Sequence, residues 1–468
     1  MTAPAAGFVV AIDNGSQSTK VLIVDGSGAV HASARVPLRP YASPAPGRWE
    51  HPDDDLWDSI VTALRAAMAE FRGDPAEIRG VGLCTIRFCR AVLRADGHLA
   101  QPVMSWMDER VPRAYERETD DAVFVTTSSG YIGHRLTGER RDAAGNVQGV
   151  WPVDTTRWTW SADAEDYVRC GMDPSMLFEL VAPGELLGTV TPEASAVTGL
   201  PVGIPVIATS NDKAVEALGA GMRAEGDALL SLGTYVATMT PGSEVRQSDA
   251  FWTNFAAEPH GYLYESHGVR RGMWTVSWFR DLLASPSGGY SETELNVGAE
   301  LIPPGADGLF VALDWLASVD EPWRRGAIVG FDGTQGRFHV YRAILEALAI
   351  ETSFADARAR RALGRPLEGL IVTGGGSASD LMLTILAAVY GVPVRTPAVS
   401  DAAGMGAAIT AAVATGLHRS VAEAVACMVR IDKRVSVDPT LRESYVAVAN
   451  RYATVLPRIR ELFAGTDY

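Results

Sequence analysis

Phe8–Val–Val–Ala–Ile–Asp–Asn–Gly–Ser–Gln–Ser–Thr–Lys20 is the stretch that decides how this 468-residue chain is expected to fold. Phe8–Ile12 is an apolar run typical of a buried strand, and Lys20–Val24 is a second such run. Between them, Asp13–Thr19 is composed of the small and polar residues that turns prefer. The pattern predicts a β-hairpin with a polar tip.

The tip of this hairpin carries groups suited to a phosphate. Gly15 allows the backbone to come close to an anion, and the neighbouring hydroxyls and ammonium can bind one. Asp13 can hold a hydrated Mg²⁺, because this ion binds one or two carboxylates and keeps several waters. Polar hairpin tips are common, however, so this one alone is weak support for a phosphate site. The side chains concerned are Ser16, Ser18, Thr19 and Lys20.

A second strand–turn–strand pattern occurs near the middle of the chain. Ala228–Met239 runs from one apolar segment through Gly233 and Thr234 into another. It repeats the organisation of the first hairpin. The repetition predicts two related domains that face each other across a cleft.

A third glycine-rich loop lies between an apolar run and a helical pattern. Leu370–Ser379 contains three consecutive glycines, Gly374–Gly376, and Asp380–Tyr390 follows with the character of a helix. Glycines at this place allow close backbone approach, and a helix start favours anions. The spacing matches neither GxxxxGK[ST] nor GxGxxG, so neither a P-loop nor a Rossmann site is predicted.

Asp212 is the best candidate for a catalytic base. It follows the buried run Val206–Ala208 and precedes Ala214–Gly221, which has helical character. A carboxylate placed at the end of a buried strand can take a proton from a hydroxyl. An Asp at this place can equally cap the helix, and the segment by itself favours the cap. The three loops elsewhere in the chain favour the base.

Taken together, these motifs resemble the FGGY carbohydrate kinase family, within the actin/hexokinase/Hsp70-like ATPase superfamily. The resemblance implies an α/β fold of two ribonuclease H-like domains, 1–222 and 223–468, with an active cleft between them. It runs over nearly the whole chain and rests on Asp13–Lys20, Gly47–Glu50 with Trp57, Ser105–Arg110, Tyr131–Glu139 with Asp142, Gly326–Gly330, His339–Glu346, Gly374–Ser379, Asp401 and Gly406–Ala408.

The resemblance also implies roles for individual residues. Asp212 would accept the proton of an acceptor hydroxyl during transfer of the γ-phosphoryl group of ATP, and Asp13 would hold Mg²⁺. On the acceptor side, the implied ligands are Arg87, Trp106, Asp108, Trp49 and Glu50. ATP would be bound by Gly15, Ser16, Gln17, Ser18, Lys20, Gly233, Thr234, Gly330, Gly375, Gly376 and Ser379.

The segment Gly82–Arg90 departs from the relatives whose acceptors are known. Xylulose kinases usually carry Ser-Gly-Gln-Met-His-Gly here, and that run is absent. Glycerol kinases carry Asn-Gln-Arg-Glu, of which only the arginine is matched, by Arg87, with Phe88 in place of the glutamate. Arg87 can donate several hydrogen bonds to a polyol, or it can form a salt bridge with Asp108 or another acid. The expected acceptor is a ketopentose such as xylulose or ribulose, or a short polyol such as erythritol or glycerol.

Composition limits the partners and the compartment. The net charge of −15 argues against nucleic acid as a partner, since phosphate backbones need a basic face. The four cysteines show no CxxC spacing, Met1–Gly7 has no leader pattern, and Ala402–Gly416 is too short to span a membrane. We therefore expect a cytoplasmic protein with no membrane role, and a homodimer stays open. A non-catalytic ATP-regulated binding protein or a pseudokinase of the same fold is the alternative.

Overall fold

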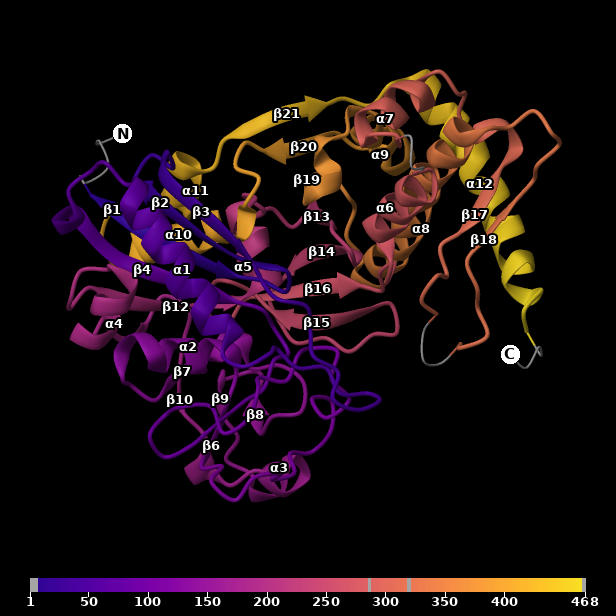
Figure 1. The fold of residues 1–468 in the computed structure, drawn as a ribbon. Helices are drawn as coiled ribbons and strands as arrows, with labels where there is room; N and C mark the ends of the chain where they lie inside the picture. Colours follow the sequence, from indigo (N-terminus) through magenta and orange to yellow (C-terminus); the bar gives the residue numbers. More distant parts are fainter. Residues whose placement is uncertain (1–6, 285–287, 318–320, 465–468) are drawn as a thin grey trace.

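The computed structural model describes residues 7–284, 288–317 and 321–464, so residues 1–6 of the N-terminal segment discussed above lie outside it. The molecule consists of two α/β halves, each built on one large sheet (Figure 1). The first sheet belongs to the N-terminal part of the chain and the second to the C-terminal part. This agrees with the predicted two-domain architecture.

The first sheet has six strands, ordered β11-β12-β4-β1-β2-β3. Strand β1 lies at its centre, antiparallel to β2 and parallel to β4, and β12 continues parallel to β4. β1 and β12 are buried almost throughout, which agrees with their apolar runs. The strands are β1 Phe8–Asn14, β2 Ser18–Asp25, β3 Val30–Pro37, β4 Ile78–Thr85, β11 Leu186–Thr189 and β12 Pro205–Asn211.

The second sheet repeats this arrangement. Its order is β15-β16-β14-β13-β19-β20-β21, with β13 antiparallel to β14 and parallel to β19. The series β3-β2-β1-β4-β12 thus corresponds to β16-β14-β13-β19-β20, as expected for two ribonuclease H-like domains. The strands are β13 Asp227–Leu232, β14 Val236–Gly242, β15 Phe251–Phe255, β16 Tyr262–Ser266, β19 Gly369–Thr373, β20 Val394–Pro397 and β21 Ile431–Val435.

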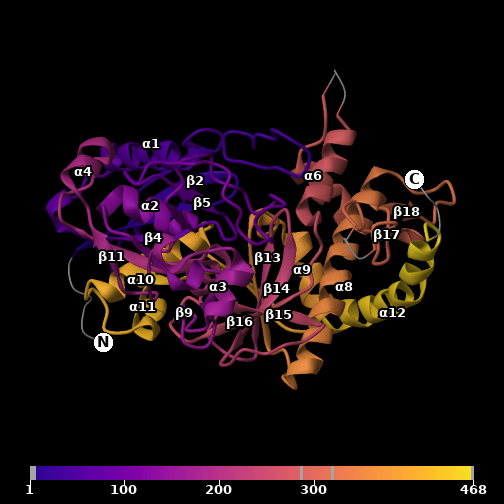
Figure 2. The same cartoon turned by 90° about the horizontal axis from the view of Figure 1, so that it is seen from below.

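Helices α5 (Asp212–Gly219) and α10 (Ala402–Ala414) pack tightly against each other between the two sheets. A Cβ on Gly219 would lie 1.8 Å from the Ala402 carbonyl oxygen, and one on Gly406 would lie 2.0 Å from that of Val215. Only glycine permits this approach. α10 also packs on β1 and β4, so a late part of the chain covers the first sheet (Figure 2).

Most of the remaining helices pack on the sheets or on other helices. The first of them is α1 (Asp55–Glu70) and the last is α12 (Pro439–Glu461). No helix in the described part of the chain is long and apolar enough to cross a bilayer. The others are α2 Ser128–Thr137, α3 Ala164–Cys170, α4 Pro192–Thr198, α6 Gly272–Leu282, α7 Glu292–Glu300, α8 Arg337–Leu363, α9 Asp380–Tyr390 and α11 Val421–Met428.

Short strand pairs complete the molecule. Three of them belong to the irregular lower part of the first half, and the fourth lies beside α8 and α12 (Figure 1). They are β5 Ala91–Leu93 with β6 Phe124–Thr126, β7 Arg141–Ala143 with β10 Glu179–Val181, β8 Val153–Asp154 with β9 Thr159–Trp160, and β17 Phe310–Ala312 with β18 Ala327–Val329.

Candidate active site

The first hairpin is tighter than the sequence predicted, because β1 extends to Asn14 and β2 begins at Ser18. Its tip is therefore Gly15, Ser16 and Gln17. At its base, the Lys20 ammonium lies 3.0 Å from Asp13 Oδ2 and 3.2 Å from Oδ1 of Asp401. Asp401 caps the N-terminus of α10, so this cluster joins the N-terminal hairpin to a C-terminal helix.

The two carboxylates of this cluster fit the chemistry of a divalent cation. Burial, followed by the nearby Asp401 charge, raises the pKa of Asp13 to about 7. Asp401 Oδ2 is buried and lacks a hydrogen-bond partner among the described residues. The described ranges contain no group of three or more His, Cys, Asp or Glu side chains that could hold a metal. A hydrated Mg²⁺ needs only one or two carboxylates.

The tip of the second hairpin meets the tip of the first. Gly233 and Thr234 lie between β13 and β14, and the Gln17 side-chain amide donates a hydrogen bond of 3.3 Å to Thr234 Oγ1. These residues are 217 positions apart in the chain. The repeated pattern seen in the sequence is therefore brought together in space.

The third loop lies next to the second hairpin. Gly374 adopts φ +82°, and a Cβ there would lie 2.5 Å from the Leu232 carbonyl oxygen, so only glycine fits. Gly375 and Gly376 form a short 3₁₀ turn, and Ser379 caps α9 by accepting a hydrogen bond from the Met382 amide. These features agree with the predicted strand–loop–helix.

Gly330 does not join these loops. It follows β18, and its backbone packs against Gly308 at the far side of the second half (Figure 1). No described contact links it to the hairpins, in contrast to the other glycines of the predicted nucleotide site.

Asp212 is not the cap of the helix that it begins. Asn211 fills that position, since its side-chain oxygen accepts a hydrogen bond from the Ala214 amide. The Asp212 side chain is 24% exposed, and its Oδ1 lies 3.8 Å from Nε of Arg87. Burial raises the pKa of Asp212, while Arg87 and Lys213 oppose this shift. The carboxylate is thus partly exposed and lies next to Arg87.

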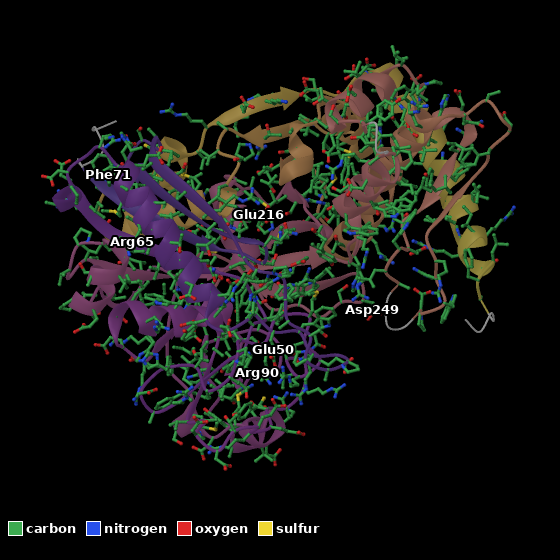
Figure 3. The ribbon with its side chains drawn as sticks, viewed as in Figure 1. Glu50, Arg65, Phe71, Arg90, Glu216 and Asp249 are labelled. Carbon is green, nitrogen blue, oxygen red and sulfur yellow. The ribbon has the colours of Figure 1, made fainter. Side chains whose placement is uncertain are left out.

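Lys213, the residue after Asp212, is largely buried. Its ammonium lies 2.8 Å from Glu216 Oε2 and donates a hydrogen bond of 2.9 Å to Ser231 Oγ. Glu216 also accepts hydrogen bonds from Ser231 and from Thr373, at 2.8 and 2.7 Å. Figure 3 shows Glu216 between the two halves. This pair fastens α5 to the strands that lead into the second and third loops.

Arg87 pairs with Glu265 of the second sheet and not with Asp108. Its two terminal nitrogens donate to the two carboxylate oxygens of Glu265 at 2.8 and 3.0 Å. The guanidinium also lies 5.4 Å from the ring centroid of Phe88 and 4.9 Å from that of Trp252. Glu265 and Trp252 were missed by the sequence interpretation, and the available signal was a lone carboxylate within a buried strand.

Asp108 is buried, and its carboxylate is occupied by neighbours. Arg110 donates to it through its main-chain amide, Nε and Nη2, and the Trp49 amide donates at 2.8 Å. Arg110 also bonds Glu50 at 2.6 Å. Figure 3 shows Glu50 in the lower part of the first half. The indole side chains of Trp49 and Trp106, in contrast, are exposed by 38% and 47%.

Known proteins match this arrangement along its length. The model of the FGGY family of carbohydrate kinases, N-terminal domain, matches residues 8–117 and 100–219, and that of the C-terminal domain matches residues 228–415. The chain is 43% identical over 432 residues to the uncharacterized sugar kinase YgcE of Escherichia coli, covering 91% of this chain and 88% of that protein. It is 27% identical over 472 residues to a glycerol kinase of Alkalilimnicola ehrlichii, covering 92% and 94%.

Solved structures show the same fold. The xylulose kinase from Rhodospirillum rubrum superposes with a TM-score of 0.83 at 23% identity, covering 97% of this chain and 99% of that one. The gluconate kinase from Lactobacillus acidophilus superposes with a TM-score of 0.84 at 18% identity and the same coverage. Both are similar to this chain in its two-domain architecture.

Proposed function

Because the chain belongs to the FGGY family of carbohydrate kinases and is an ATP-dependent kinase of that family, we propose that it phosphorylates a hydroxyl of a small ketose or polyol with Asp212 as the base. The observation that carries this proposal is the position of Asp212. Asn211 caps the helix in its place, so the Asp212 carboxylate remains partly exposed, 3.8 Å from Nε of Arg87.

The base works by its position. Phosphoryl transfer requires an acceptor oxygen aligned with the γ-phosphorus and a group that takes its proton. Asp212 begins α5, which Lys213 and Glu216 fasten to β13 and β19. This connection holds the base in register with the loops that would bind the phosphates, which favours a near-attack geometry.

The two hairpins would bind the phosphates of ATP from opposite sides. The first hairpin would bind one side of the phosphates through Gly15, Ser16, Gln17, Ser18 and Lys20. The second hairpin would bind the opposite side through Gly233 and Thr234. Gly375, Gly376 and Ser379 would lie under the α-phosphate and the nucleoside. Asp13, with Asp401 beside it, would hold Mg²⁺, which when bound neutralises phosphate charge. The raised pKa of Asp13 and the unpartnered Asp401 oxygen support this site.

The acceptor would lie between Asp212, Arg87 and the exposed indoles. Trp106 and Trp49 can pack against a carbon skeleton. Asp108 and Glu50 act through Arg110, because their carboxylates are bonded to it and Asp108 is buried. Asp108 would hold the Trp49 backbone, and both carboxylates would shape the pocket rim. The proposed acceptor is still a ketopentose such as xylulose or ribulose, or a short polyol such as erythritol or glycerol.

ADP release measured with and without acceptor tests the proposal. We expect turnover to depend on one ketose or polyol among a panel of three to seven carbons, because closure on the acceptor aligns the phosphate and excludes water. ADP release that is equally fast without acceptor and with every acceptor would refute a kinase acting on this class. ATP binding without any turnover would favour the pseudokinase alternative.

A further inference from the structure

The Arg87–Glu265 pair is built from both halves of the molecule at the edge of the acceptor site. Arg87 follows β4 of the first sheet, whereas Glu265 lies on β16 of the second. The residue after Arg87 is Phe88, so the carboxylate that pairs with the two terminal nitrogens of Arg87 comes from the second half, as Glu265. We propose that Glu265 restricts the acceptor to neutral sugars and polyols by occupying the guanidinium that an acidic sugar would otherwise bind.

This inference rests on the proposed function and names its substrate class. The pairing is geometrically complete, because both terminal nitrogens of Arg87 meet both oxygens of Glu265, at 2.8 and 3.0 Å. The fork uses one N–H of each terminal nitrogen and balances the charge of Arg87 with one carboxylate. Of the three N–H groups that remain, that of Nε faces a second carboxylate, since Nε lies 3.8 Å from Asp212 Oδ1.

Burial makes the pairing persistent. The Glu265 side chain is 1% exposed and the Arg87 side chain 12%. The aromatic rings of Phe88 and Trp252 lie against the guanidinium and shield it further. Removing one partner of such a pair leaves a buried charge without compensation. Arg87 is therefore held by Glu265 before any acceptor arrives.

The charge balance of the pocket then decides between acceptor classes. Arg87 is one cation facing two anions, Glu265 and Asp212. The carboxylate of an aldonate would enter beside these two anions and find the cation already engaged, which is a repulsive arrangement. Neutral hydroxyls can instead donate to the carboxylates and accept from the Arg87 edge. The geometry favours a neutral acceptor.

Paired acceptors provide the test. Each ketose or polyol of three to seven carbons is compared with the aldonate of the same length, and kcat/KM is measured by ADP release. Like charges brought together typically cost enough free energy for a factor on the order of 10², so the wild-type protein should prefer the neutral member by about that much. A preference for the aldonate, or equal rates, would overturn the inference while leaving the kinase function intact.

Variants of Glu265 sharpen the test. Glu265→Gln keeps the shape of the side chain but removes the charge that pairs with Arg87. The preference for the neutral acceptor over the aldonate should therefore fall at least about tenfold, mainly because the KM for the aldonate decreases. Glu265→Asp keeps the charge and should retain most of the preference. Glu244→Gln, at an exposed position, serves as the matched control.

Each outcome is informative. Equal losses with both acceptor classes in Glu265→Gln would show that Glu265 only maintains the fold, and the inference would be wrong. If that variant does not fold, the wild-type preference and the Glu265→Asp profile decide the question. Absence of turnover with every acceptor of both classes would instead refute the proposed function.

Discussion

The two hairpins share a backbone plan and differ in the charge of their side chains. The first carries Asp13 two residues before its glycine and Lys20 on its returning strand. The second carries Ser231 two residues before Gly233, and Ala237 lies opposite Ser231. The fold thus repeats while the chemistry does not.

This difference shows how a duplicated unit can be divided between tasks. The first half supplies most of the ionisable groups, Asp13, Lys20 and Asp212, and Asp401 of the C-terminal sequence joins them; such groups suit metal binding and proton transfer. The second half supplies mainly glycine backbone, which suits close contact with the uncharged parts and oxygens of a nucleotide. Substitutions of charge should therefore harm the first half most, and substitutions of backbone freedom should harm the second.

Asp212→Asn should give the largest effect. The amide keeps the shape of the side chain but cannot take a proton, and general base catalysis typically contributes ~10²–10⁴-fold, so turnover should fall by that order. Calorimetric ATP binding should change little. Asp281→Asn, at an exposed position on α6, is the control. Retention of more than about a tenth of turnover would show that Asp212 is not the base.

Asp13→Asn should give the second largest effect. Loss of one carboxylate should raise the Mg²⁺ concentration for half-maximal turnover, by on the order of 10–100-fold as for other perturbed metal sites. ATP binding without metal should not weaken, because a negative charge near the phosphates is removed. A metal titration of turnover and metal-free calorimetry measure both effects. An unchanged Mg²⁺ requirement would remove Asp13 from the metal site.

Gly374→Ala tests the role of glycine backbone in the second half. Gly374 has a φ of +82°, and an added Cβ would lie 2.5 Å from the Leu232 carbonyl oxygen. Alanine would therefore strain the third loop. Strain of this kind costs roughly 1–3 kcal/mol, so ATP affinity should fall about tenfold while the pattern of acceptor preference is kept. Gly203→Ala, which has φ +81° and open space around it, is the matched control for strain alone. Equal ATP affinities in the two variants would contradict a nucleotide role for the loop.

Gln17→Ala should give the smallest effect. The exposed hydrogen bond to Thr234 joins the two hairpin tips, and such bonds contribute about 0.5–1.5 kcal/mol. Its loss should weaken ATP binding a few-fold, as should Thr234→Val, and the double variant should be no worse than either single change. Fully additive losses would mean that the two tips act independently.

Sequence reasoning reached the local features and missed those made by distant pairing. The hairpins, the glycine loop and the helix after Asp212 depend on turn chemistry and periodicity within short segments, and the structure contains each of them. The burial of Lys213 could not be predicted, because it is produced by Ser231 and Glu216 around it and by strands beyond. Glu265 was missed for the same reason, since it is 178 residues from Arg87.

The division at residues 222 and 223 remains a prediction about domains. The family models divide the chain between residues 219 and 228. However, α10 and α11 belong to the C-terminal sequence and pack beside the first sheet. Chain order alone therefore does not describe which core a helix completes.

The placement of α10 has a consequence for how the protein is made. The first sheet is translated early, but one of its faces is covered by a helix that is translated much later. At ~5–20 residues per second, that face waits for tens of seconds. During this interval the buried surfaces of β1 and β4 are open to chaperones, and a chain truncated before residue 402 should not form a stable first domain.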